Sequence, residues 1–220
     1  MASGDDPLAL ARLSEVELSR ASATTLSHYD GSAERFWLGT RDHDVSQNVD
    51  ALLRHLGETR STILDLGCGP GRDLINFRDR GHLAVGLDGA LQFVRMARAN
   101  SGCEVLHQDF LELDLPAARF DGIFANASLF HVPSQELLRV LRELAAALKP
   151  GGILFSSNPR GPNREGWSGD RYCCYLDFDA YQHFMTSAGF ALLEHYYRPA
   201  GKPRDQQPWL ASVWRSINRQ

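Results

Sequence analysis

One short run of residues has side chains and a spacing that suit ligand binding. It starts with apolar residues, continues with an acid and ends with closely spaced glycines. Residues 63–73 read ILDLGCGPGRD. Glycine adopts the backbone conformations of tight turns and lets N–H groups come close to a ligand, and a helix N-terminus favours bound anions. The run therefore predicts a strand, a glycine turn and a helix start that together form one wall of a nucleotide-binding site.

A second acid stands at the end of the next apolar run, residues 83–87. Asp88 follows the glycine turn by about twenty residues, the spacing at which an acid accepts hydrogen bonds from the ribose hydroxyls of a bound nucleotide. We therefore expect Asp88 to bind a ribose.

The glycine spacing separates the possible nucleotides. The dinucleotide fingerprint G-x-G-x-x-G needs glycine at position 72, where this chain has Arg72, and the third glycine comes one residue earlier at Gly71. Arg72 would crowd a pyrophosphate but can pair with a carboxylate, and Asp65 suits an amino group. A ligand with ribose, amine and carboxylate but no phosphate is S-adenosyl-L-methionine (SAM); a nicotinamide-dependent dehydrogenase is the alternative that Arg72 disfavours.

The run resembles motif I of the class I SAM-dependent methyltransferases, whose common form is (D/E)-x-G-x-G-x-G. Four later segments match that family in order: GLD at 86–88, QDF at 108–110, FDGIFAN at 120–126 and LKPGG at 148–152. The likeness extends from about Tyr29 to the C-terminus and is closest to stand-alone methyltransferases of small molecules. It implies a methyltransferase that uses SAM and releases S-adenosyl-L-homocysteine (SAH).

The resemblance also assigns roles to residues. It implies that Asp109 and the backbone of Phe110 bind the adenine, that Arg72 meets the methionine carboxylate, and that an N-terminal aromatic helix closes over the cofactor. Plain packing of the N-terminal aromatics on the sheet is the alternative. The expected cofactor-binding residues are Tyr29, Trp37, Thr40, Asp65, Gly67, Gly69, Arg72, Asp88, Asp109, Phe110 and Asn126.

The acceptor of the methyl group should lie at the carboxyl ends of the fourth and fifth predicted strands, because ligands of open α/β sheets bind there. His131 is the candidate catalytic base, with substrate contact or packing beneath the cofactor as alternatives. Arginines interleaved with aromatic residues indicate recognition of an anion. The expected substrate-binding residues are Asn158, Arg160, Arg171, Tyr172 and Arg198. The acceptor is then a small, anionic or zwitterionic metabolite methylated on N, S or O.

The elements that must position these residues alternate along the chain. Strands are expected near 61–66, 82–87, 103–107, 120–126, 152–157, 190–198 and 208–215, and helices near 21–38, 45–56, 71–80, 90–100, 134–148 and 178–188. This alternation predicts an α/β fold with a Rossmann-like, doubly wound, mainly parallel sheet of seven strands that ends in an antiparallel hairpin. Ser134 is the expected N-cap of the helix over 134–148.

The order of elements, together with the lid that the family resemblance implies, predicts two parts. Residues 1–60 form a helical N-terminal cap or lid, and residues 61–220 form the SAM-binding core, with a substrate loop at 158–176.

Composition limits the function classes. The chain has 220 residues and a formal charge of −4, which argues against a nucleic-acid partner. We expect no membrane span and no secretory signal in Met1–Leu13. The four cysteines lack zinc-type spacing, so we expect no bound metal. Reduced thiols indicate a cytoplasmic protein. We expect a monomer or a homodimer.

Two further hypotheses about the function remain. A protein with the SAM fold can activate or scaffold a partner without catalysis. The adjacent residues Cys173 and Cys174 suggest methylation of a soft metalloid such as arsenite, although neighbouring cysteines have poor geometry for it.

Overall fold

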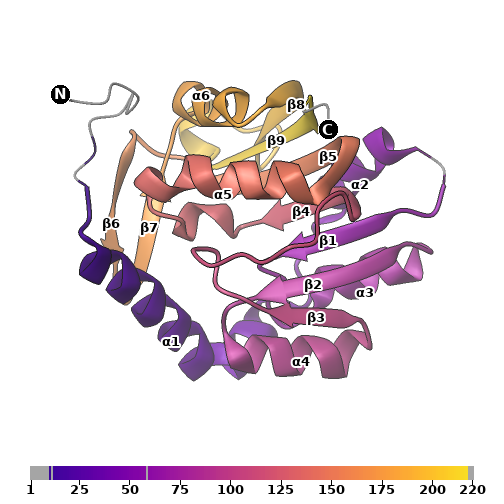
Figure 1. Ribbon diagram of the computed structural model, residues 1–220, viewed down its shortest axis with the longest axis horizontal. Coiled ribbons are helices and arrows are strands. Elements are labelled where there is room, and N and C mark those ends of the chain that lie inside the picture. Colours follow the sequence, from indigo (N-terminus) through magenta and orange to yellow (C-terminus); the bar gives the residue numbers. More distant parts are fainter. Residues whose placement is uncertain (1–9, 11, 58, 218–220) are drawn as a thin grey trace.

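One sheet carries the fold, with its strands in the order β3-β2-β1-β4-β5-β9-β8 (Figure 1). The strands from β3 to β5 pair in parallel, whereas β9 runs antiparallel to both of its neighbours. The bounds are β1 Thr62–Leu66, β2 Leu83–Asp88, β3 Glu104–His107, β4 Phe120–Asn126, β5 Leu148–Pro159, β8 Phe190–Arg198 and β9 Trp209–Ser216. The predicted fold class is confirmed, including its C-terminal antiparallel hairpin.

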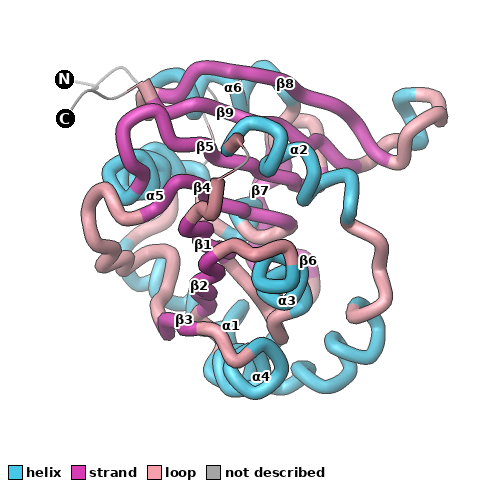
Figure 2. The backbone as a smooth tube through the Cα atoms, turned by 90° about the vertical axis from the view of Figure 1, so that its right-hand side faces the viewer, coloured by secondary structure: helices cyan, strands magenta, loops and turns pink. Residues whose placement is uncertain are grey.

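The computed structural model describes residue 10 and residues 12–57 and 59–217, and most of the Met1–Leu13 segment lies outside them. Helices cover both faces of the sheet. They are α1 Glu15–Thr40, α2 Ser46–Leu56, α3 Arg72–Asp79, α4 Leu91–Ser101, α5 Ser134–Ala147 and α6 Phe178–Ser187, with short 3₁₀ turns η1 Leu129–His131 and η2 Arg204–Gln206. An edge-on view shows α5 on one side of the sheet and α2 and α3 on the other (Figure 2).

Packing of apolar side chains fixes these layers. On α5, Leu137, Leu141 and Leu144 recur at helical spacing and are buried against the sheet together with residues of α6. On the opposite face Phe124 of β4 stacks on Phe155 of β5 with ring centroids 4.9 Å apart. The sheet is thus covered on both faces, as a parallel sheet requires.

Helix α1 begins earlier than the predicted start at residue 21. Ser14 and Glu17 form a reciprocal capping box that satisfies the first free N–H groups of the helix. The helix packs against α4 and β7 and runs along the edge at which the parallel strands end (Figure 1). By contrast, α2 packs directly on β4, β5 and β9.

Two expectations need correction. Residues 158–176 are not a plain loop, because β6 Arg164–Ser168 and β7 Arg171–Tyr175 form an antiparallel hairpin. Ser134 is not the N-cap of α5: Pro133 holds that position, and the Ser134 hydroxyl donates to Glu165 on β6 at 2.8 Å. The Ser134 hydroxyl therefore bonds to a distant strand instead of capping its own helix.

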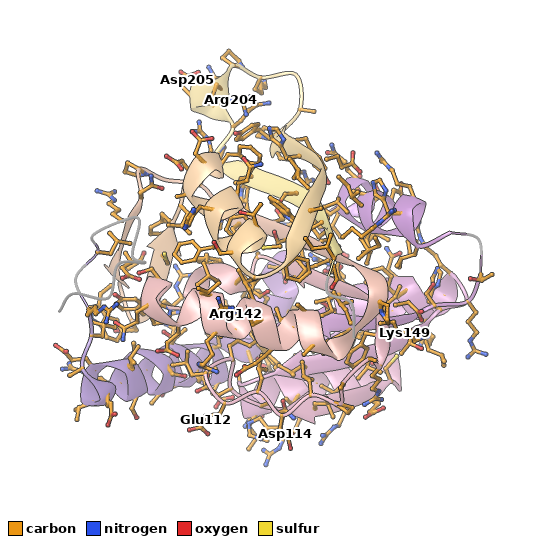
Figure 3. The ribbon with its side chains drawn as sticks, turned by 45° about the horizontal axis from the view of Figure 1, so that its top comes forward. Glu112, Asp114, Arg142, Lys149, Arg204 and Asp205 are labelled. Atoms are coloured by element: carbon orange, nitrogen blue, oxygen red, sulfur yellow. The ribbon has the colours of Figure 1, made fainter. Side chains whose placement is uncertain are left out.

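Several charged side chains lie at two opposite edges of the molecule. Figure 3 shows Glu112 and Asp114 at one edge and Arg204 and Asp205 at the opposite edge, all pointing away from the core. Among the described residues, no helix is both long enough and apolar enough to cross a membrane.

Candidate active site

A cavity of about 670 Å³ opens at the carboxyl ends of β1, β2 and β4, beneath α1. Its size is in the usual range for small-molecule sites, roughly 300–1,000 Å³. Its walls come from α1, the glycine turn after β1, the ends of β2, β3 and β4, the 3₁₀ turn η1 and the start of β9. All of the expected cofactor residues except Asp65 line it.

The glycine turn owes its shape to residues without side chains. Gly67 has φ +74°, a conformation that L-residues rarely adopt, and a Cβ built there would lie 2.5 Å from the Cβ of Ser128. Its N–H donates to the Leu87 carbonyl at 2.8 Å, which ties the turn to β2. The turn therefore lies close to the end of β4 and presents bare backbone to the cavity.

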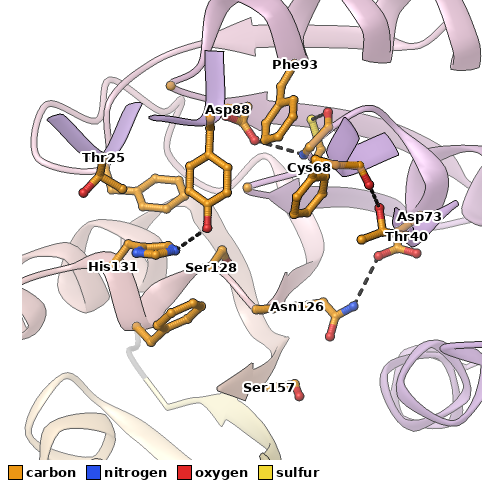
Figure 4. Close-up of a pocket in the computed structure, with 18 of the residues that line it drawn as sticks. Thr25, Thr40, Cys68, Asp73, Asp88, Phe93, Asn126, Ser128, His131 and Ser157 are labelled. Carbon is orange, nitrogen blue, oxygen red and sulfur yellow. Dashed lines mark hydrogen bonds between the residues drawn. The ribbon is translucent and has the colours of Figure 1, made fainter. Parts of the chain in front are cut away.

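Asp88 ends β2 inside the cavity (Figure 4). Its two oxygens accept hydrogen bonds from the N–H groups of Gly69 and Ala90, each at 2.9 Å. Burial raises the pKa of this carboxyl to about 6, and those hydrogen bonds oppose the rise. A carboxylate held in this way keeps lone pairs free for a ligand with hydroxyl donors, such as a ribose.

Asp109 and Phe110 follow β3 on the same cavity. One oxygen of Asp109 accepts from the Leu111 N–H at 2.9 Å, and the other accepts from the Ser22 hydroxyl of α1. This contact ties the first half of α1 to the end of β3, where the resemblance expects the adenine.

Asp65 lies behind the cavity wall. It is only 2% exposed, and one of its oxygens has no hydrogen-bond partner among the described residues. Burial raises its pKa well above the usual range, and the neighbouring carboxylate of Asp73 adds to the rise. Direct contact with a ligand in the cavity would require it to become accessible.

Arg72 is engaged within the protein. Its fork binds both oxygens of Asp73 at 2.8 Å, and its remaining nitrogen donates to the Thr40 carbonyl at 3.0 Å, near the end of α1. The expected contact with a methionine carboxylate would have to compete with these bonds. In this structure Arg72 joins α3 to the C-terminus of α1 instead.

Asn126 continues this polar chain from the end of β4. Its amide nitrogen donates to Asp73 at 3.3 Å, and its oxygen accepts from Asn48 of α2 at 3.0 Å. Asn48 in turn accepts from the Tyr196 hydroxyl at 3.0 Å. These hydrogen bonds fix the Asn126 side chain in the lining of the cavity (Figure 4).

His131, the predicted base, is hydrogen-bonded on both ring nitrogens. Nε2 lies 2.8 Å from the Tyr29 hydroxyl, the contact dashed at His131 in Figure 4. Nδ1 lies 2.8 Å from the Tyr172 carbonyl. Burial lowers the pKa of this imidazole to about 4, so the ring is neutral near pH 7. Tyr29, expected as a cofactor residue, therefore meets the predicted base within the cavity.

The expected substrate residues divide into two groups. Arg171 and Arg198 line the cavity. Arg160 does not, because its guanidinium donates to the Gln207 and Arg204 carbonyls. Asn158 lies on a separate small cavity, and the Tyr172 side chain is buried beside Trp167.

Other lining residues have no role in the sequence prediction. On α1, a stripe at spacings of three and four faces the cavity, and this periodicity could have marked it in the sequence. Besides the predicted Tyr29 and Thr40, the stripe includes Ser22, Thr25, Leu26 and Phe36. His43, Asp44, Phe93, Ser157 and Trp209 also line the cavity, and no local motif marks them.

The structure gives no support to metalloid chemistry. Cys173 and Cys174 are buried in β7 and do not line the cavity, and burial raises the pKa of both thiols. Within the described ranges, no group of three or more His, Cys, Asp or Glu could hold a metal ion.

Known proteins match this chain in sequence and in fold. Residues 63–152 match a family model described as a methyltransferase domain. A trans-aconitate 2-methyltransferase from Azoarcus sp. (strain BH72) is 37% identical over 118 residues, which are 50% of this chain and 44% of that protein. A malonyl-[acyl-carrier protein] O-methyltransferase from Pseudescherichia vulneris is 34% identical over 110 residues, 49% of this chain and 43% of that protein.

Among solved structures, the chain resembles a 1,6-didemethyltoxoflavin-N1-methyltransferase from Burkholderia thailandensis, solved with 1,6-didemethyltoxoflavin and SAH bound. The TM-score is 0.78 at 23% sequence identity, and the match covers 94% of this chain and 93% of that one. This likeness shows the fold. The chain spans less than half the length of the two curated relatives above.

The sheet order, the glycine turn and the acid after β2 define the SAM-binding class of Rossmann-like proteins. The family match then specifies the kind: this chain carries a methyltransferase domain and has the fold of the class I SAM-dependent methyltransferases. The predictions of family, fold and cofactor are thereby confirmed. The bare glycine turn and the ligand-accessible Asp88 carboxylate fit SAM.

Proposed function

We propose that this protein transfers a methyl group from SAM to a small, anionic or zwitterionic metabolite with an N, S or O acceptor atom. The observation that carries this proposal is the pair of arginines on the cavity. Arg171 and Arg198 both line it, and neither forms a salt bridge with a carboxylate of the described residues. Arginine forks bind carboxylates through paired, charge-assisted hydrogen bonds.

The names of two relatives support an acidic acceptor. Trans-aconitate and the malonyl group are both carboxylic acids. The net charge of −4 speaks against phosphate-rich nucleic acid as the substrate.

Different residues of the cavity would bind SAM and the methyl acceptor. We assign the ribose to Asp88, the adenine to Asp109 with the Phe110 backbone, and the floor beneath the methionine portion to the turn at Gly67 and Gly69. Bound SAM supplies a methyl group already activated on a sulfonium, so the main task of the protein is to align the acceptor with it. We further propose that α1 acts as the lid, because Trp37 and Thr40 face the cavity from it.

The test uses methyl-labelled SAM and a panel of small carboxylic acids, with label transfer to each acid as the readout. Arg171→Lys and Arg198→Lys should raise KM for the methylated acid, because lysine cannot reproduce the fork, while the Kd for SAH stays within twofold. Arg164→Lys is the matched control, since Arg164 is exposed on β6 and does not line the cavity. Unchanged KM in both variants, or transfer to neutral acceptors only, would overturn the anionic-acceptor proposal.

A further inference from the structure

Tyr29 and His131 occupy the cavity as a hydrogen-bonded pair whose proton positions follow from its surroundings. The Tyr172 carbonyl only accepts hydrogen bonds, so the His131 nitrogen 2.8 Å from it, Nδ1, carries the ring proton. The neutral ring then has a lone pair on Nε2, which accepts the Tyr29 hydroxyl proton across 2.8 Å. The backbone of β7 thus fixes the tautomer of His131, and His131 fixes the rotation of the Tyr29 hydroxyl.

With its proton turned toward His131, the Tyr29 oxygen has only lone pairs to offer a ligand. Tyr29 lines the cavity that Asn126 and the glycine turn also line. Its ring is held edge-on to Phe36 at 5.8 Å and tilted against Phe93 at 5.5 Å, which keeps water from much of the phenol. At this place the cavity therefore presents an acceptor for a proton.

The charged and titratable groups around the pair are Arg171, His28, Cys173 and Asp88. Burial raises the pKa of the Tyr29 phenol, whereas the nearby Arg171 guanidinium lowers it and so favours negative charge on the phenol oxygen. Arg171, one of the two arginines proposed to bind the substrate anion, thus also stabilises the ionised form of Tyr29.

On the basis of the proposed function, we propose that Tyr29 and His131 form a proton-accepting pair, and that the methyl acceptor is an N–H or O–H group of the acid rather than its carboxylate. A carboxylate is ionised at neutral pH and has no proton to lose. An amine, a hydroxyl or a ring N–H carries a proton that it loses in forming the neutral methylated product. The Tyr29–His131 pair can take up the proton of such an N–H or O–H acceptor.

The lone pair of the acceptor atom forms the bond to the methyl carbon, the carbon–sulfur bond breaks, and its electron pair stays on sulfur, which becomes a neutral thioether. The acceptor's proton passes to the Tyr29 oxygen while the Tyr29 proton passes to Nε2 of His131. The imidazolium then loses this proton to water, which its low pKa makes easy.

One half of the test needs no acceptor. In ¹⁵N-histidine-labelled protein we expect the His131 signals, assigned by their loss in His131→Gln, to show the Nδ1–H tautomer with no titration near pH 6.5. Tyr29→Phe should shift the Nε2 signal, whereas Tyr197→Phe, which removes a hydroxyl of β8 outside the cavity, should not. An Nε2–H tautomer, or a His131 signal unmoved by Tyr29→Phe, would overturn the pair.

The other half uses the panel acids that carry an amine, hydroxyl or ring N–H. Tyr29→Phe should lower kcat by roughly 10²–10⁴-fold, the usual range for a general base, with SAH affinity within twofold of the unmodified protein. His131→Gln in the Tyr29→Phe background should add little, because the two residues act as one unit. The rate of Tyr29→Phe should also rise with pH toward the pKa of the acceptor, a rescue that a purely structural role for Tyr29 would not produce.

The two proposals fail separately. Methylation of an acid at an unchanged rate in Tyr29→Phe, or of a plain carboxylate, overturns the proton-accepting role and leaves the anionic acceptor intact. Loss of SAH binding in Tyr29→Phe with normal kcat makes Tyr29 a cofactor residue only, and also overturns the role. Rate loss in Tyr29→Phe with neutral N–H or O–H acceptors, but none with acids, keeps the pair and overturns the anionic acceptor.

Discussion

Asp88 is a buried carboxylate whose protonation should control cofactor binding. Its pKa is raised to about 6, and hydroxyl donors of a bound ribose favour the ionised form. SAH affinity should therefore be constant above about pH 7 and fall by up to about tenfold per pH unit below the pKa of Asp88. Calorimetric titration between pH 5 and pH 8 measures this dependence.

The isosteric variant Asp88→Asn cannot ionise. It should lose this pH dependence and bind SAH more weakly at pH 7.5 by roughly 1.5–3 kcal/mol, the scale of a hydrogen bond to a charged group. Asp114→Asn is the control, because Asp114 is exposed and points away from the core (Figure 3). A pH dependence that persists in Asp88→Asn would assign the effect to another group.

Single residues were predictable from sequence where a backbone motif sets their surroundings. Gly67, Asp88 and Asp109 stand at a strand end or just after one, and each lines the cavity. The engagement of Arg72 and Arg160 was less predictable, because each also donates to a backbone carbonyl of a distant segment, Thr40 for Arg72 and Gln207 for Arg160. The neighbouring Asp73 was a local sign of engagement for Arg72, whereas nothing local in the sequence marked the carbonyl partners of Arg160.

At the scale of elements, the glycine turn should be sensitive to a single added methyl group. Gly67→Ala meets both backbone strain at φ +74° and a contact 2.5 Å from the Cβ of Ser128. Gly102→Ala at φ +67° meets the same strain in open space. We expect about 1–2 kcal/mol of destabilisation from strain in both, and about 1–3 kcal/mol more in Gly67→Ala from overpacking.

Urea denaturation measures both free energies of unfolding, and SAH binding is measured alongside. Gly67→Ala should also lose SAH affinity, while Gly102→Ala keeps it. Equal destabilisation of the two variants would show that the turn can move away from β4 without cost.

The C-terminus of α1 depends on one guanidinium. Arg72→Lys keeps the charge but loses the fork that joins Asp73 to the Thr40 carbonyl. We expect backbone amides near Trp37–Arg41 to exchange hydrogen roughly tenfold faster or more, because hydrogen bonds to charged groups are worth about 1.5–3 kcal/mol.

Arg78→Lys lies on the same helix, α3, but its arginine donates to Ser101 and Asp79 rather than to α1. It should leave exchange at Trp37–Arg41 unchanged. Protection that survives Arg72→Lys would mean that packing of α1 on α4 and β7 holds this end without the arginine.

Elements were predictable where the hydrophobic period was clear. The parallel strands and α5 lie close to their expected positions, because apolar runs and an i, i+3, i+4 stripe specify them. The hairpin β6–β7 was not foreseen, because Gly166 and Gly169 interrupt its alternation and its pairing partner is set by the turn.

For the whole molecule, cofactor binding should appear as stability. A ligand at about 100 times its Kd adds about 2.7 kcal/mol to the native state, which in a chain of this size raises Tm by roughly 5–11 °C. We expect this shift with SAH and none with NAD, measured by calorimetry. A shift with NAD and none with SAM or SAH would overturn the assignment of the cavity to SAM.

The strand order also has a consequence for synthesis on the ribosome. β8 is made before β9, yet among the described strands β8 pairs with β9 alone, which lies between it and β5. While the ribosome is still adding β9, β8 has no strand to pair with, even when the parallel part of the sheet has emerged. β8 can therefore join the sheet only after β9 has been made, either as a β8–β9 hairpin that docks onto β5 or after β9 has already paired with β5.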